Sequence, residues 1–209
     1  MVLTDLEGLR SFCAELSSDQ PSPGGGTASA AAGAMAASLL AMVCAITRKS
    51  KKHEANWSEL DRHKESLLRL RDELTALAHE DARAYDLLVE AMRKRKERKD
   101  EESEKLVLLA LRHATDIPHT TSKRCMEVLE TAERVAEIGS KNAYSDAGVA
   151  VLLAEAGLRG ALMNVVINAE TDKDPAYVEG IRAEVGSLER RAAASARSAL
   201  AKLGIARGA

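Results

Sequence analysis

Aromatic residues are nearly absent from this chain, since only five of its 209 residues are Phe, Tyr or Trp. Strands favour aromatic and β-branched side chains, whereas Ala, Leu, Glu, Lys and Arg favour helices. The scarcity of aromatics therefore argues against a β fold. The composition, 45 % hydrophobic and 30 % charged, excludes both a disordered tail and a membrane bundle. We expect an all-α protein.

Cysteine is also scarce, and no charge dominates. Cys13, Cys44 and Cys125 are widely spaced, which excludes a disulfide framework and the paired spacing of a metal site, so we expect reduced, buried thiols and no metal. The formal net charge of −2 gives no attraction to nucleic acid. The N-terminus, MVLTDLE, lacks the basic start of a signal peptide. These features predict a cytoplasmic protein.

One stretch without charge, residues 28–46, is long enough to cross a bilayer. It consists mostly of Ala, Ser and Gly, which gain little free energy from lipid compared with Leu, Ile or Phe. We therefore predict a buried core helix here and no membrane partner.

Helix signals recur along the whole chain and predict a single domain, residues 1–209, built as a bundle of about seven helices with one long helix. Pro21 to Gly26 breaks the chain after the first helix. Pro118 suits the first turn of a fifth helix, and Ser145-Asp146 suits the cap of a sixth. The expected helices span residues 6–16, 27–48, 53–95, from about 106, from 118, 145–170 and from 175.

The long third helix carries a carboxylate in an apolar series. Leu67, Leu74 and Leu88 are spaced by multiples of seven residues, and Asp81 occupies the missing position. A carboxylate there is costly unless it is paired, hydrogen-bonded or protonated. Asp81 is therefore either a functional group or a structural residue, which is capped or salt-bridged if buried, or exposed because the helix is rotated. Tyr85, one turn later, is placed to donate to it or to join the core.

The turn Gly24-Gly25-Gly26 leads directly into a helix N-terminus, where free backbone N–H groups can hold an anion. A plain tight turn is the alternative. No Gly-Lys-Ser/Thr follows, so the turn is not the phosphate loop of nucleotide-binding enzymes.

A basic cluster closes the same helix: Arg48, Lys49, Lys51 and Lys52. These cations either complement the dipole of the helix C-terminus or recognise carboxylates of a substrate tail.

Small residues form a stripe on the expected sixth helix, which predicts close packing in the core or across a dimer. The stripe comprises Ala150, Ala154, Gly157, Ala161, Asn164 and Asn168. Buried asparagines need partners, so Asn164 and Asn168 are candidates to bind a polar ligand. His119 has no converging partner and is expected to be a surface or capping residue.

Four segments together resemble the formiminotetrahydrofolate cyclodeaminase and methenyltetrahydrofolate cyclohydrolase family. They are PSPGGGTASAAA at residues 21–32, EDARAY at 80–85, SDAGV at 145–149 and GALMNVVIN at 160–168. They stand in the family's order and span nearly the whole chain. One departure is Lys141-Asn142, where the family commonly has Gly-Asn.

The resemblance implies an all-helical homodimer that binds a folate, with Asp81 as the catalytic carboxylate. It maps the family's glycine turn to Gly24, Gly25 and Gly26, and its Ser-Asp motif to Ser145 and Asp146. The family's transferase domain has no counterpart in this sequence.

The function expected from this resemblance is that of a stand-alone methenyltetrahydrofolate cyclohydrolase, which opens 5,10-methenyltetrahydrofolate to 10-formyltetrahydrofolate without a metal or redox cofactor. Asp81 would stabilise the cationic ring or activate water. The glycine turn and Asn164 would orient the pterin, and Lys49 or Lys52 the glutamate tail. The alternatives are formiminotetrahydrofolate cyclodeaminase, which releases ammonia, and a non-catalytic helical scaffold.

Overall fold

The computed structural model describes residues 6–205, which form six α-helices, two short 3₁₀ helices and no strand. Most of the N-terminal segment on which the signal-peptide prediction rests lies outside these residues. The α-helices are α1 (Glu7–Leu16), α2 (Gly25–Arg48), α3 (Trp57–Arg98), α4 (Glu101–Ile138), α5 (Tyr144–Ala169) and α6 (Pro175–Lys202). The 3₁₀ helices are η1 (Lys51–Asn56) and η2 (Lys141–Ala143). The prediction of an all-α fold is confirmed.

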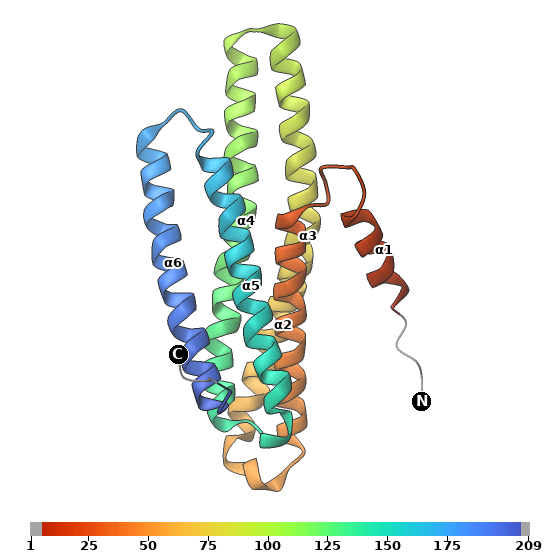
Figure 1. The fold of residues 1–209 in the computed structure, drawn as a ribbon, viewed down its shortest axis with the longest axis vertical. Coiled ribbons are helices and arrows are strands. Elements are labelled where there is room, and N and C mark those ends of the chain that lie inside the picture. Colours follow the sequence, from red (N-terminus) through yellow and green to blue (C-terminus); the bar gives the residue numbers. More distant parts are fainter. Residues whose placement is uncertain (1–5, 206–209) are drawn as a thin grey trace.

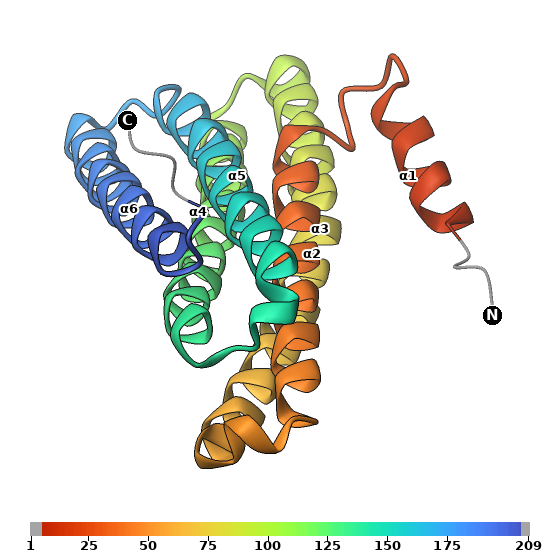
Figure 2. The ribbon, with the colours of Figure 1, turned by 60° about the horizontal axis from the view of Figure 1, so that its bottom comes forward.

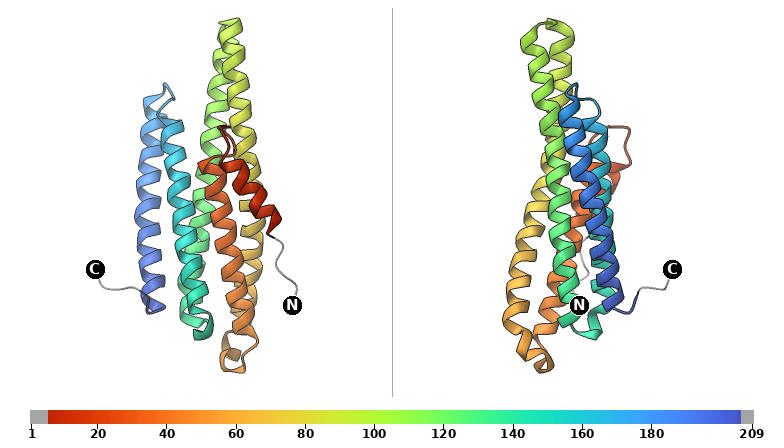
Figure 3. Two further views of the ribbon diagram at one scale, coloured as in Figure 1. Left: turned by 45° about the vertical axis from the view of Figure 1, so that its right-hand side comes forward. Right: turned by 90° about the vertical axis from the view of Figure 1, so that its left-hand side faces the viewer.

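Helices α2, α3, α4 and α5 form an elongated bundle, and α6 packs against α4 and α5 (Figure 1). The hairpin of α3 and α4 projects beyond the other helices at one end of the bundle (Figures 1 and 3). Helix α1 stands apart from the bundle and buries no residue (Figure 2). The glycine turn, Gly24 to Gly26, leads into α2 beside the middle of α3, and the candidate site lies there.

Capping residues explain several helix boundaries. Asp100 and Ser103 form a reciprocal capping box at the start of α4, and Lys99 ends α3 with a left-handed backbone, φ 54°. Asp174 caps α6, with Pro175 in its first position. Helix α2 differs, because its N-cap residue Gly24 has no side chain to satisfy the first-turn N–H groups.

The predicted fourth and fifth helices are one continuous helix, α4, so the count of seven is wrong. Pro118 lies inside α4 and not in a first turn. A proline inside a helix has no N–H, so the carbonyl four residues earlier loses its donor. Here that carbonyl belongs to Ala114, and the Nδ2 of Asn168 donates to it at 2.7 Å.

His119 is buried, with 7 % of its surface exposed, and its Nε2 lies 3.1 Å from a carboxylate oxygen of Glu184. The prediction of a surface or capping histidine is therefore also wrong.

Two further boundaries differ from expectation. Helix α5 begins at Tyr144, so Ser145 and Asp146 lie within its first turn and do not cap it through their side chains. The 3₁₀ helix η1 occupies the expected start of the third helix, and α3 begins at Trp57.

The small-residue stripe of α5 packs closely against α2 within the chain. A Cβ atom added to Gly157 would lie 2.7 Å from the backbone oxygen of Ser29 and 3.1 Å from the nitrogen of Gly33. Ala150, Ala154 and Ala161 are fully buried. The two helices can approach so closely only because small side chains line both.

Replacing Gly157 with Leu should therefore overpack the contact between α2 and α5. We expect a loss of roughly 1–3 kcal/mol in the free energy of unfolding, measured by denaturant titration. Gly180→Leu is the control, because a Cβ atom at Gly180 meets nothing within 4 Å. Equal stability of the two variants would contradict close packing at Gly157.

Two helical segments are long and apolar enough to cross a membrane by length and composition alone. Their apolar windows have mean hydropathies of 2.0 (Gly25–Arg48) and 1.6 (Lys141–Ala169), and 50 % and 44 % of these windows are buried inside the bundle. The predicted core helix is thus only partly covered. The exposed large side chains of α2 and α5 form an apolar face: Met35, Met42, Ile46, Val149, Leu152, Met163 and Ile167.

Candidate active site

A cavity of about 220 Å³ lies where the glycine turn, α3, α4 and α5 meet. It brings together seven of the residues singled out in the sequence: Gly24, Gly25, Gly26, Asp81, Tyr85, Asn164 and Asn168. Its remaining lining residues are Pro21, Ser22, Leu88 and Ala114. Segments more than 80 residues apart in the chain therefore contribute to one site.

Asp81 faces the start of α2 and takes the role that a capping side chain would have there. The Oγ1 of Thr27 donates to its Oδ2 at 2.8 Å, and the backbone N–H of Thr27 also donates to the carboxylate. Leu67, Leu74 and Leu88 are buried, as the leucine series predicted, whereas Asp81 is half-buried at its place in the series. The carboxylate is both a cap of α2 and a wall of the cavity.

Gly26 allows the close approach of Asp81. A Cβ atom added to Gly26 would lie 2.7 Å from Cγ of Asp81, closer than real Cβ atoms come to other atoms. The residue at this position of the turn therefore needs to be glycine. By contrast, a Cβ atom on Gly25 would lie 3.6 Å from Nδ2 of Asn164, an ordinary contact.

The pKa of Asp81 is raised above its ordinary value, because burial disfavours the charged form. The two hydrogen bonds from Thr27 lower the pKa but do not offset the burial. Among the residues described, no cation forms an ion pair with this carboxylate. A raised pKa in a cavity is typical of catalytic carboxylates.

The side-chain amides of Asn164 and Asn168 each donate a hydrogen bond to a backbone carbonyl. The Nδ2 of Asn164 donates to the oxygen of Gly160 at 2.9 Å, and the Nδ2 of Asn168 to the oxygen of Ala114 at 2.7 Å. No group between residues 6 and 205 donates to either Oδ1. The two asparagines therefore offer hydrogen-bond acceptors to a ligand.

Tyr85 lines the cavity but remains exposed, and no hydrogen bond joins it to Asp81. Neither sequence-based role of Tyr85, donor to Asp81 or core residue, is therefore seen. Its place on the wall leaves it available to a ligand.

The other four candidate residues lie at the opposite end of the bundle. Lys49 follows the end of α2, and Ser145 and Asp146 lie in the first turn of α5, near the point where Thr47 accepts a hydrogen bond from the backbone of Ser140. From Gly26 to Lys49 the helix rises about 34 Å at 1.5 Å per residue. Lys49, Lys52, Ser145 and Asp146 are thus separated from the cavity of their own chain, and their binding role stays a prediction.

Two contributors to the site, Thr27 and Ala114, are not among the residues predicted from the sequence. A hydroxyl residue in the first helical turn, directly after three glycines, was a detectable signal for Thr27. Ala114 was not detectable, because its carbonyl is free only when α4 continues through Pro118.

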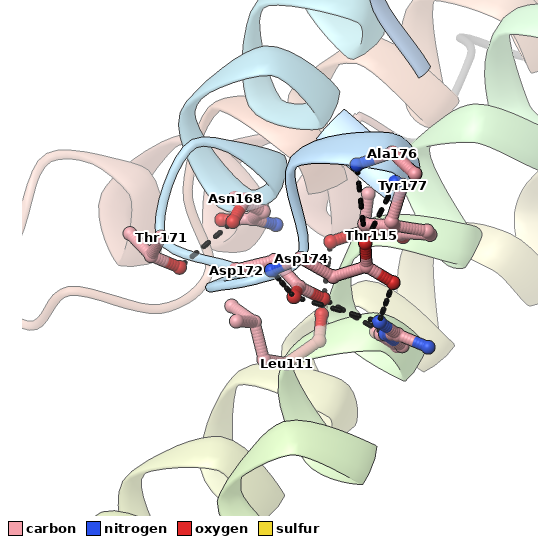
Figure 4. Close-up of polar contacts among 9 residues, drawn as sticks. Leu111, Thr115, Asn168, Thr171, Asp172, Asp174, Ala176 and Tyr177 are labelled. Atoms are coloured by element: carbon pink, nitrogen blue, oxygen red, sulfur yellow. Dashed lines mark hydrogen bonds and ion pairs between the residues drawn. The ribbon is translucent and has the colours of Figure 1, made fainter. Parts of the chain in front are cut away.

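A polar cluster fixes the chain just beyond Asn168 (Figure 4). Arg112 on α4 pairs with the buried carboxylate of Asp172 at 2.8 Å and with Asp174 at 3.3 Å, and its guanidinium stacks on Tyr177 at 4.5 Å. The Oγ1 of Thr171 donates to the backbone oxygen of Asn168 at 2.8 Å. The C-terminal end of α5 is therefore held firmly against α4.

The side chains that line the cavity suit a ligand with positive charge and hydrogen-bond donors. Of the described residues that line its wall, Asp81 alone is charged, and both asparagine side chains present acceptors. Desolvated carboxylates of this kind gain most from a cationic ligand. In the part of the chain described, no group of three or more His, Cys, Asp or Glu residues could hold a metal ion.

Comparisons with known proteins show which family the sequence and the fold resemble. A family model described as formiminotransferase-cyclodeaminase matches residues 8–187. A methenyltetrahydrofolate cyclohydrolase of Methylorubrum extorquens is 40 % identical over 194 residues, covering 88 % of this chain and 93 % of that protein. A formimidoyltransferase-cyclodeaminase of Sus scrofa is 29 % identical over 197 residues, covering 93 % of this chain but only 36 % of the relative. The crystal structure of a formiminotetrahydrofolate cyclodeaminase from Thermotoga maritima matches with a TM-score of 0.86 at 28 % identity, covering 94 % and 95 % of the two chains.

Proposed function

Because the chain belongs to the formiminotransferase-cyclodeaminase family, we propose that it is a methenyltetrahydrofolate cyclohydrolase, which hydrolyses 5,10-methenyltetrahydrofolate to 10-formyltetrahydrofolate. Its similarity to a protein of that name extends over nearly the full length of both chains. The bifunctional relatives are about three times as long as the matched segment, since this chain spans 36 % of their length.

The observation that carries the proposal is the half-buried carboxylate of Asp81, which forms no ion pair with any described residue, in a cavity where the asparagine side chains offer neutral acceptors. 5,10-Methenyltetrahydrofolate carries a positive charge on the amidinium that joins its two nitrogens, and its pterin carries N–H donors. Asp81 stabilises that charge, and the Oδ1 atoms of Asn164 and Asn168 accept hydrogen bonds from the N–H groups of the pterin.

The cavity holds only the reacting end of the substrate. Its volume of about 220 Å³ is smaller than the roughly 300–1,000 Å³ of pockets that enclose a whole drug-sized ligand. The benzoyl and glutamate parts therefore extend outside the cavity.

In the reaction, the oxygen of a water molecule adds to the amidinium carbon while Asp81 takes one of its protons as general base. In the resulting tetrahedral centre the bond from carbon to N5 breaks, and N5 receives the proton held by Asp81. The hydroxyl proton leaves to solvent as the formyl C=O forms on N10. No electron is transferred, so the step needs no redox cofactor.

The deciding experiment mixes purified protein with 5,10-methenyltetrahydrofolate and follows the loss of its near-ultraviolet absorbance. Catalysed decay supports the cyclohydrolase. Ammonia release from 5-formiminotetrahydrofolate, with no acceleration of the decay, would support the cyclodeaminase alternative. The absence of both activities would support the alternative of a non-catalytic helical scaffold.

The raised pKa of Asp81 predicts an acid limb in the pH profile. Because the general base must be ionised, kcat/KM should fall as the pH drops through this pKa, with a midpoint above the ordinary value of about 3.9. The effect on stability has the opposite sign, since a carboxyl whose pKa rises on folding contributes stability at low pH that is lost as pH increases through that pKa. Activity and unfolding should be measured over the same pH series. An acid limb at or below pH 3.9 would contradict the assignment.

We also propose that the protein is a homodimer through the apolar face of α2 and α5. Met163 and Ile167 are 68 % and 66 % exposed there, and a surface of this kind is typical of protein interfaces. In a two-fold contact with antiparallel α2 helices, the end of α2 in one copy lies beside the glycine turn of the other. Lys49, Lys52, Ser145 and Asp146 of one copy would then approach the cavity of the second.

Leu152→Glu should disrupt this dimer, because it places a charge in the apolar face where Leu152 is 54 % exposed. Light scattering coupled to gel filtration should show a shift toward the 22.4 kDa monomer and a loss of turnover. Leu109→Glu is the control, since Leu109 is more exposed than Leu152, at 67 % against 54 %, but lies on the α3–α4 hairpin. A wild-type monomer would refute the dimer.

A cytoplasmic location and the absence of nucleic-acid and membrane partners remain predictions from the composition.

A further inference from the structure

Pro118 creates a free carbonyl at the edge of the cavity. It lies inside α4, and its ring nitrogen carries no hydrogen. In a regular helix the N–H of residue 118 would donate to the oxygen of residue 114. The carbonyl of Ala114, a residue that lines the cavity, therefore has no donor within its own helix.

Asn168 on α5 supplies the missing donor, and this fixes the orientation of its amide. Its Nδ2 lies 2.7 Å from the oxygen of Ala114. A carbonyl can only accept, so the atom facing Ala114 has to be the amide nitrogen and not the oxygen. Oδ1 is consequently the atom that Asn168 offers to a ligand.

The backbone of Asn168 is held independently of this bond. The Oγ1 of Thr171 donates to its backbone oxygen, and the pair of Arg112 and Asp172 fixes the following turn to α4. Loss of the bond to Ala114 would therefore release the side chain of Asn168 without moving the helix that carries it.

We infer that Pro118 is a positioning residue: by freeing the Ala114 carbonyl, it orients Asn168 so that Oδ1 accepts a hydrogen bond from an N–H group of the pterin. The inference rests on the proposed function for the identity of the ligand. The orientation of the Asn168 amide does not depend on that function, because it follows from contacts within the chain. Asn168 contacts the substrate, and Pro118 acts through it.

Pro118→Ala is the test, because alanine restores an N–H that competes for the carbonyl of Ala114. We expect the KM for 5,10-methenyltetrahydrofolate to rise about threefold to tenfold, the range for one hydrogen bond, with kcat within twofold of wild type. The melting temperature should not fall, since alanine favours a helix interior and proline does not. Pro175→Ala is the control, because the first helical position needs no N–H donor.

A double-mutant cycle separates this role from a general effect on α4. If Pro118 acts through Asn168, adding Pro118→Ala to Asn168→Ala should change KM no further. The same threefold to tenfold rise in both backgrounds would overturn the inference, and so would an unchanged KM in the single variant.

Crystal structures of the wild type and of Pro118→Ala give a readout that needs no substrate. We expect the 2.7 Å contact between Asn168 and Ala114 to open in the variant. An unchanged contact overturns the inference even if the wild type is active. A wild type without turnover refutes the proposed function, while the contact still decides the inference.

Discussion

Asp81→Asn should lower turnover by on the order of 10²–10⁴-fold, the contribution expected of one acid–base group. The amide has the shape of the carboxylate but cannot take a proton from water or balance the charge of the amidinium. The assay is the decay of 5,10-methenyltetrahydrofolate at saturating substrate. The acid limb of the pH profile should disappear with the carboxylate.

The same variant should fold normally, which separates catalysis from the capping role of Asp81. The Oδ1 of an asparagine can still accept from Thr27, whose hydroxyl can turn to accept from the amide nitrogen. Asp86→Asn is the matched control, because Asp86 is an exposed aspartate on the same helix. Wild-type turnover in Asp81→Asn would mean that the carboxylate only caps α2.

The site was largely predictable wherever its residues break a local rule. Asp81 interrupts a leucine series, and three consecutive glycines precede an alanine-rich helix. Both features are anomalies that the sequence displays without any knowledge of the fold, and the structure places them against each other.

Features that depend on contacts between distant segments were not predictable. Pro118 is a helix-start signal by local rules, and it lies inside α4 where Asn168, 50 residues later, satisfies the carbonyl that the proline leaves free. Likewise, Ser145 and Asp146 have the residue types of a cap, yet α5 begins one residue earlier, after the 3₁₀ helix η2. Local propensity gives way when tertiary contacts compensate.

Gly26→Ala should reduce turnover on the order of 10²-fold, the cost of misplacing a catalytic group by about 1 Å. The backbone tolerates alanine here, because Gly26 already lies in the first turn of α2. The added Cβ atom, however, would come within 2.7 Å of Cγ of Asp81. Since the carboxylate is tied to Thr27 on the same turn, it must leave either that bond or the cavity.

A graded series of glycine variants measures this dependence on contact distance. Gly25→Ala should have the smaller effect, since its Cβ atom would meet Asn164 at an ordinary 3.6 Å. Gly180→Ala, with nothing within 4 Å, controls for the helix propensity of alanine, and the melting temperature of each variant shows whether the fold is kept. If Gly26→Ala retains wild-type turnover, the glycine turn does not position the carboxylate. If its loss matches that of Asp81→Asn while the protein stays folded, the turn and the carboxylate act as one unit.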